Sequence, residues 1–224
     1  MVELTPRFTS ALDYARAAHL GVVRKGSAVP YLSHVLVVAG LVLEHGGGED
    51  EAIAALLHDV AEDSGGEARL DDIGRRFGDR VAGIVRDCSD SLVADPRRKE
   101  GWWPRKLRHL DHLARMGERS LLVSAADKTH NCESTVADYR RHGEDLWARF
   151  NSDAGRAGQL WYHRRVSEVL SARLDGEPSR LAERLQRAVT TLVALVEANV
   201  GAARMAADAE VAEAHERAGP GRDA

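Results

Sequence analysis

One segment contains the pattern from which the architecture of this chain follows: Glu51-Ala52-Ile53-Ala54-Ala55-Leu56-Leu57-His58-Asp59-Val60-Ala61-Glu62-Asp63. Its apolar residues recur at helical spacing, and Ser64-Gly65-Gly66 stops the pattern. We therefore expect a helix that ends near Asp63. At about 100° per residue, His58 and Glu62 lie one turn apart on one face, and Asp59 and Asp63 form a second pair beside them.

Four polar groups thus crowd one side of an otherwise apolar helix. Burying so many ionisable side chains without partners costs several kcal/mol, so they face solvent, a cation, or a cleft that contains both. A bound metal resolves this conflict most simply. The alternative is an ordinary His-Asp dipeptide before a solvated helix end, although carboxylates at a helix C-terminus oppose the macrodipole.

Two further positions complete a candidate metal set. His34 lies in an earlier apolar helical run, and Asp127 lies in Ser124-Ala125-Ala126-Asp127-Lys128-Thr129-His130-Asn131. Imidazole and carboxylate groups together can bind a divalent metal and supply proton-transfer groups beside it. The set comes from three expected helices, which have to converge as they do in helical bundles with metal sites.

Five segments occur in the order of one known family: Ala18-His19-Leu20-Gly21-Val22-Val23-Arg24-Lys25-Gly26, Pro30-Tyr31-Leu32-Ser33-His34, Ala55–Asp63, Phe77–Ala82 and Ala125–Asn131. They resemble the HD-domain metal-dependent phosphohydrolases, and within them the (p)ppGpp hydrolase domain of RelA/SpoT homologues and its small stand-alone relatives. The resemblance implies an HD-domain helical bundle. It also implies that Glu62 and Asp63 position and deprotonate the attacking water, beside metal ligands His34, His58, Asp59 and Asp127. The family metal is usually manganese, but this ligand set also suits iron, zinc or cobalt.

The resemblance assigns nucleotide binding to Arg24 and Lys25, where a solvated basic pair is the alternative. Asn131 lies one turn after Asp127 and either holds the nucleotide or is a buried, satisfied amide. Tyr162 matches an aromatic residue that flanks the nucleotide, or else belongs to the core. The implied reaction is hydrolysis of (p)ppGpp to GDP or GTP and pyrophosphate. Because Arg86–Asp90 lacks the family's usual Thr-Lys ending, the substrate stays open, and a phosphatase for another nucleotide such as NADPH or a nucleoside monophosphate is the alternative. A non-catalytic ligand-binding module is a further alternative, against which the complete metal and Glu-Asp set argues.

Helical periodicity dominates the chain and alternating strand-like runs are nearly absent, so we expect an all-α fold. The expected helices cover residues 5–20, 34–45, 51–63, 70–77, 79–88, 104–116, 118–141 and 159–174. We divide the chain into an HD domain (1–175), a long C-terminal amphipathic helix (176–217) and a frayed tail (218–224). The long helix packs on the bundle or mediates self-association as a homo-oligomer.

Composition fits a compact soluble enzyme, with 224 residues, 44% of them hydrophobic. A net charge of −4 argues against a nucleic-acid partner and favours a small phosphorylated molecule. No apolar run is long enough to cross a membrane, and the N-terminus lacks the pattern of a signal peptide. With only two cysteines as well, we expect a cytoplasmic protein.

Overall fold

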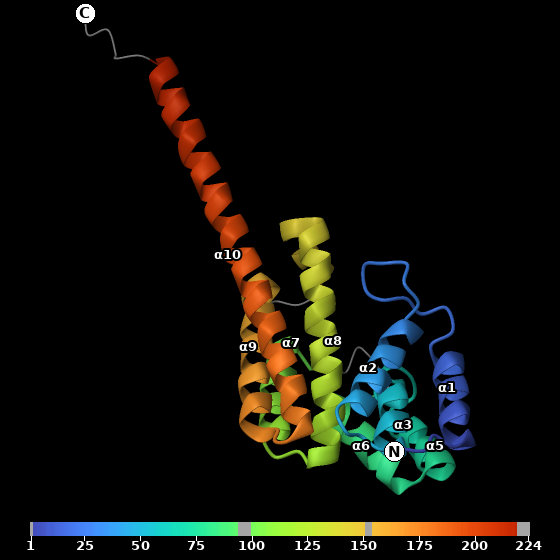
Figure 1. Ribbon diagram of the computed structural model, residues 1–224. Coiled ribbons are helices and arrows are strands. Elements are labelled where there is room, and N and C mark those ends of the chain that lie inside the picture. Colours follow the sequence, from blue (N-terminus) through green and yellow to red (C-terminus); the bar gives the residue numbers. More distant parts are fainter. Residues whose placement is uncertain (1, 94–99, 151–153, 219–224) are drawn as a thin grey trace, which may run out of the picture.

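In the computed structural model of this protein, residues 2–93, 100–150 and 154–218 are described, with side chains up to Gly201. Regular structure in these ranges is helical, apart from an isolated bridge between Val23 and Pro30, so the all-α prediction is confirmed. Figure 1 shows the helices as a bundle from which one long helix projects. The elements are α1 (Pro6–Ala18), α2 (Leu32–Glu44), α3 (Glu49–Leu57), α4 (Val60–Asp63), α5 (Gly66–Phe77), α6 (Asp79–Cys88), α7 (Trp102–Leu113), α8 (Glu118–His142), the 3-10 helix η2 (Gly143–Arg149), α9 (Gly155–Arg173) and α10 (Glu177–Ala218).

The helix α3 forms the centre of the N-terminal half. Every residue of α3 from Glu51 to Leu57 is buried, and the helix packs against α1, α2, α6 and α8. The apolar run is therefore surrounded by the core on all sides. His58 and Asp59, which follow it, can meet other polar groups only at its C-terminal end. That end faces α2 and α8, which contribute the other residues of the candidate site.

The expected single helix over residues 51–63 is wrong in one respect, because the structure interrupts it at His58 and Asp59. His58 Nδ1 donates to the Ala55 carbonyl oxygen at 2.8 Å, the acceptor that a regular helix reserves for the Asp59 N–H. A new turn, α4, then starts after Asp59. The break falls at the two residues that the candidate site depends on.

Two helix starts also differ from expectation. The helix α2 begins at Leu32 instead of His34, because the carbonyls of Pro30 and Tyr31 accept the N–H groups of Ser33 and His34. The helix α5 begins at Gly66 instead of Leu70, because Gly65 at φ +99° reverses the chain directly after α4. The glycines 46–48 end α2 as expected, with Gly46 at φ +89°.

The C-terminal helix α10 packs along α8 and α9 through its first half. Leu181, Leu185 and Leu192 are fully buried there and belong to the same core as α3. Its later turns continue beyond the neighbouring helices (Figure 1). Residues 219–224, for which the sequence predicts a frayed tail, lie outside the described residues.

Candidate metal and nucleotide site

Four of the predicted residues converge where α2, the α3–α4 junction and α8 meet. Ligand atoms of His34, His58 and Asp59 all lie within 4.8 Å of one another. Asp127 adds a carboxylate oxygen, Oδ1, at 3.2 Å from His34 Nε2 and 3.6 Å from His58 Nε2. Segments up to 93 residues apart in the chain thus place two imidazoles and two carboxylates around one point.

The two imidazole nitrogens that face this point are buried and make no hydrogen bond. Carboxylate oxygens lie 3.0 Å from His58 Nε2 and 3.2 Å from His34 Nε2, yet not in directions that suit a ring N–H. Two buried lone pairs directed at carboxylates are costly without a shared partner, and a cation among them satisfies all four groups. The residues present therefore fit a divalent metal with nitrogen and oxygen ligands.

Three of the four groups are fixed by a donor or acceptor behind them. The His58 ring N–H donates to Ala55 O, which leaves the Nε2 lone pair facing the cluster. The Tyr31 hydroxyl donates to Asp59 Oδ2. Lys128 Nζ donates to Asp127 Oδ2 at 2.7 Å, and Asn131 Nδ2 donates to Asp127 Oδ1.

Charge in the cluster is balanced locally. Burial lowers the pKa of His34 and favours its neutral form. Burial opposes ionisation of Asp127, but the Lys128 ammonium and the two imidazoles outweigh it and hold the Asp127 pKa well below its usual range. At His58 the carboxylates of Asp59 and Asp127 outweigh burial and raise the pKa. The anionic carboxylates thus attract positive charge to the point that the Nε2 atoms face.

Glu62 and Asp63 lie on α4, directly after the cluster. Glu62 is half-buried, and its Oε2 accepts from the Asp90 N–H at 2.8 Å, while Asp63 is exposed. Burial, Asp59, Asp127 and, last, the Asp63 carboxylate raise the pKa of Tyr31. Both predicted catalytic carboxylates thus follow the cluster residues His58 and Asp59 within five positions of the chain.

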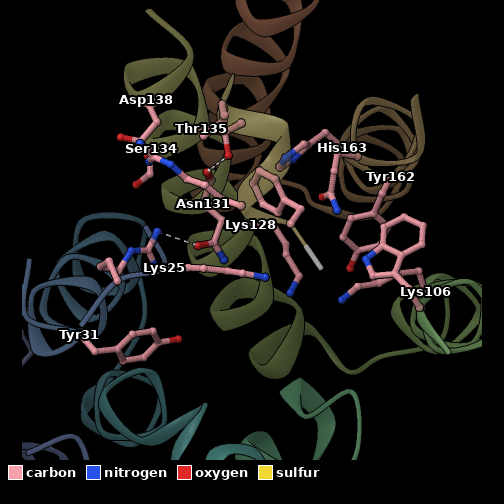
Figure 2. Close-up of a pocket in the computed structure, with 16 residues that line it drawn as sticks. Lys25, Tyr31, Lys106, Lys128, Asn131, Ser134, Thr135, Asp138, Tyr162 and His163 are labelled. Carbon is pink, nitrogen blue, oxygen red and sulfur yellow. Dashed lines mark hydrogen bonds and ion pairs between the residues drawn. The ribbon is translucent and has the colours of Figure 1, made fainter. Parts of the chain in front are cut away.

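A cavity of about 330 Å³, a size that suits a small ligand, opens beside the cluster, and its lining includes Lys128 and Asn131, which bond to Asp127. Figure 2 shows the ammonium groups of Lys25, Lys106 and Lys128 pointing into one space. Among the described residues that line it, Asp138 is the acid, and the cations are Arg24, Lys25, Lys106, Lys128 and Arg149. The lining therefore favours an anionic ligand.

The predicted nucleotide-binding residues all line this cavity. Arg24 Nη2 donates to Asn131 Oδ1 at 3.1 Å (Figure 2), so the Asn131 amide bridges Arg24 and Asp127. Lys25 lies 5.8 Å from the centre of the Phe150 ring. Tyr162 is buried among Trp102, His109 and Lys106, and its hydroxyl has no hydrogen-bond partner.

Sequence reasoning gave no role to two residues that the structure places in the site. Tyr31 and Lys128 were inside the quoted motifs, and their positions next to the candidate ligands were the available signal. Lys106 enters the cavity from α7, where it pairs with Asp90. Asp90 lies between α6 and α7, 16 residues before Lys106, so no helical spacing rule predicts this pair.

Residues 11–160 of the chain match the sequence pattern of the HD domain family. This chain belongs to the HD-domain family. The resemblance read from the motifs is thereby confirmed, and with it the expectation of a phosphohydrolase. The family and the His-His-Asp cluster together indicate a divalent metal.

This HD protein is similar to guanosine-3′,5′-bis(diphosphate) 3′-pyrophosphohydrolase MESH1 of Drosophila melanogaster, with 32% identity over 56% of this chain and 67% of the relative. It is 34% identical to the bifunctional (p)ppGpp synthase/hydrolase SpoT of Escherichia coli over 56% of this chain, but over only 17% of SpoT. A solved structure described as a metazoan ortholog of SpoT that hydrolyzes ppGpp superposes with a TM-score of 0.65. It covers 84% of this chain and 97% of that one at 24% identity, which supports the fold.

No helix in the described part of the chain is both long and apolar enough to cross a membrane. Cys88 and Cys132 are buried and free of disulfides.

Proposed function

We propose that this HD-domain phosphohydrolase removes the 3′-pyrophosphate from guanosine tetra- or pentaphosphate. The single observation that carries the proposal is the hydrogen-bond path from Arg24 through Asn131 to Asp127. It joins the cation-lined cavity to the His/Asp cluster along one face of α8, on which Asp127 and Asn131 lie one turn apart. A nucleotide with phosphate groups in the cavity would thus have a phosphorus atom beside the cluster.

The proposed metal ligands are His34 Nε2, His58 Nε2, Asp59 and Asp127, and manganese is the proposed ion. Such a cation supplies charge neutralisation at a phosphoryl oxygen and lowers the pKa of water. The residues behind the ligands keep them in place: Tyr31 holds Asp59, and Lys128 holds Asp127. This arrangement leaves the two carboxylates oriented before substrate binds.

Glu62 and Asp63 are the proposed proton-transfer groups. Water would attack the 3′-linked phosphorus and lose a proton to one of these carboxylates. The bond from phosphorus to the 3′ oxygen then breaks, and that oxygen takes up the proton held by the carboxylic acid, so that GDP or GTP and pyrophosphate leave and the carboxylate is restored. Glu62 is oriented for this role by the Asp90 N–H, which holds one of its oxygens at 2.8 Å.

Lys25, Lys106, Lys128 and Arg149 would bind the phosphate groups of the nucleotide. Arg24 would orient the nucleotide through its link to Asn131. Tyr162 would contribute its unpartnered hydroxyl as a donor at the same cavity, since Lys106 lies over its ring and Trp102 contacts that ring at an interplanar angle of 72°. A pocket with five cations suits a polyphosphate better than a nucleoside monophosphate.

Substrate profiling tests this assignment. Purified protein with manganese is offered guanosine tetraphosphate, NADPH and nucleoside monophosphates, and nucleotide products are separated by chromatography. Conversion of guanosine tetraphosphate to GDP is expected. Cleavage of NADPH or a monophosphate alone would overturn the substrate, and inactivity towards the whole panel would favour a binding module.

We also propose a cytoplasmic location, which the two free cysteines support. The division into an HD domain (1–175) and an appended helix (176–217) stays our proposal. Self-association through that helix is a further prediction, and light scattering of the purified protein measures it.

A further inference from the structure

His130 lies directly behind one of the proposed metal ligands. Its Nδ1 is 2.6 Å from Nδ1 of His34, and the two residues are 96 positions apart in the chain. Two ring nitrogens at this distance share one proton, because two lone pairs or two N–H groups would repel each other. One ring is therefore the donor and the other the acceptor.

The relative placement of the rings favours a well-formed hydrogen bond. The ring planes differ by 23°, and the ring centres are 4.9 Å apart. The 2.6 Å between the nitrogens accounts for more than half of that separation, so the rings meet edge to edge and do not lie face to face. The shared proton thus lies close to both ring planes, where the acceptor lone pair points.

The direction of the bond follows from the other nitrogen of His34. His34 Nε2 faces the cluster, 3.2 Å from Asp127 Oδ1, and is buried without a hydrogen bond. A neutral imidazole that offers the Nε2 lone pair carries its proton on Nδ1. We infer that His130 is a positioning residue that accepts this proton and so fixes both the tautomer and the ring orientation of His34 for metal binding.

The helix α8 would then act on the metal site twice. Asp127 and His130 are three residues apart, on one face of α8, so the helix provides one ligand and the support for another. The second imidazole, His58, has the same arrangement, but its acceptor is the Ala55 backbone carbonyl. A backbone carbonyl cannot be removed by substitution, whereas the His130 side chain can, so the test is made at His130. The inference rests on the metal site of the proposed function and not on its nucleotide.

The test measures metal affinity without nucleotide. His130→Leu removes the acceptor and keeps most of the volume, and His130→Asn can place a carbonyl oxygen near the former Nδ1 position. Manganese binding is measured by equilibrium dialysis for both variants, for the wild type, and for His142→Leu, which changes an exposed histidine at the end of the same helix. Circular dichroism and thermal unfolding report folding.

We expect His130→Leu to weaken manganese binding roughly 10–100-fold, as loss of an outer partner of a ligating histidine does, while His130→Asn recovers most of it and His142→Leu changes nothing. A general structural defect would instead lower the melting temperature of both His130 variants without separating their metal affinities. Equal affinity in wild type and His130→Leu would overturn the inference. Wild-type protein that binds no divalent metal would overturn both the inference and the metal site, whereas metal binding without (p)ppGpp hydrolysis would overturn only the substrate.

Nitrogen-detected or nitrogen-edited imidazole NMR of the zinc-loaded protein gives a second readout. The account places the His34 proton on Nδ1 in the wild type, with Nε2 bound to the ion. A His34 proton on Nε2 would contradict it, whatever the affinities.

Discussion

At the scale of single residues, Asp127 joins the two parts of the site. Its carboxylate faces both imidazoles and receives Lys128 and Asn131. Replacing Asp127 with Ala should remove metal and turnover together, because it deletes a ligand and leaves Lys128 buried without its counter-ion. Activity is measured together with metal content by mass spectrometry. Asp13→Ala, which changes an exposed side chain on α1, is the control. Retained metal and activity in Asp127→Ala would remove this residue from the site.

For Glu62, in contrast to Asp127, we expect substitution to leave metal binding intact and to lower only turnover. Glu62→Gln keeps the size of the side chain and can still accept from the Asp90 N–H, but it cannot take a proton. Manganese affinity should stay unchanged while kcat falls by roughly 10²–10⁴-fold, the usual contribution of a general base. Steady-state kinetics at saturating metal measure this. A kcat equal to that of the wild type would show that Glu62 is not the base.

His163 allows a prediction on pH. Burial, reinforced by Lys128 and Lys106, lowers its pKa to about 4 from an ordinary 6.5. The unfolded chain therefore binds more protons than the folded protein between these values, and the free energy of unfolding falls as pH drops through that window. From about pH 7 to about pH 5, His163 should account for a loss of at most about 2 kcal/mol.

Urea unfolding of chelator-treated protein at both pH values measures this loss. His163→Gln should show a smaller decline than the wild type, while His142→Gln, an exposed control, should match the wild type. An equally steep decline in His163→Gln would contradict the assignment.

At the scale of elements, the position of α10 is open to a packing test. Leu192 is fully buried against the bundle, whereas Leu195 on the same helix is partly exposed. Leu192→Ala should cost about 2–5 kcal/mol in the free energy of unfolding, as deletion of a buried leucine does. Leu195→Ala should cost clearly less. Equal losses from the two variants would mean that α10 does not pack as described.

The elements also show what sequence could and could not predict. Apolar periodicity gave most helices, and Thr5-Pro6 marked the start of α1, where the Thr5 hydroxyl accepts from the Arg7 N–H. The break between α3 and α4 was missed. It depends on the His58 side chain, which bonds to the Ala55 carbonyl in place of the Asp59 N–H, and apolar periodicity carries no information on such a side-chain bond.

In the site, too, some residues could be predicted from the sequence and others could not. The motifs named residues that the structure brings together, because helical spacing and motif order are properties of the sequence. The partners behind them, Tyr31 for Asp59 and His130 for His34, depend on how α2 meets α4 and α8. The sequence suggested only a structural or solvent role for His130, since nothing in its neighbours indicates a residue 96 positions away.

At the scale of the whole molecule, the bundle places a cation-lined cavity directly beside a metal-fitting cluster, and Asn131 on α8 contacts both. The central claim is that the two act together on one phosphorylated nucleotide. Pyrophosphate release from guanosine tetraphosphate tests it most directly, with chelator-treated protein before and after manganese is restored, and with Asp59→Ala beside it. The account predicts release that depends on manganese and is absent from Asp59→Ala. Release that persists without metal, or that is undiminished in Asp59→Ala, would contradict it.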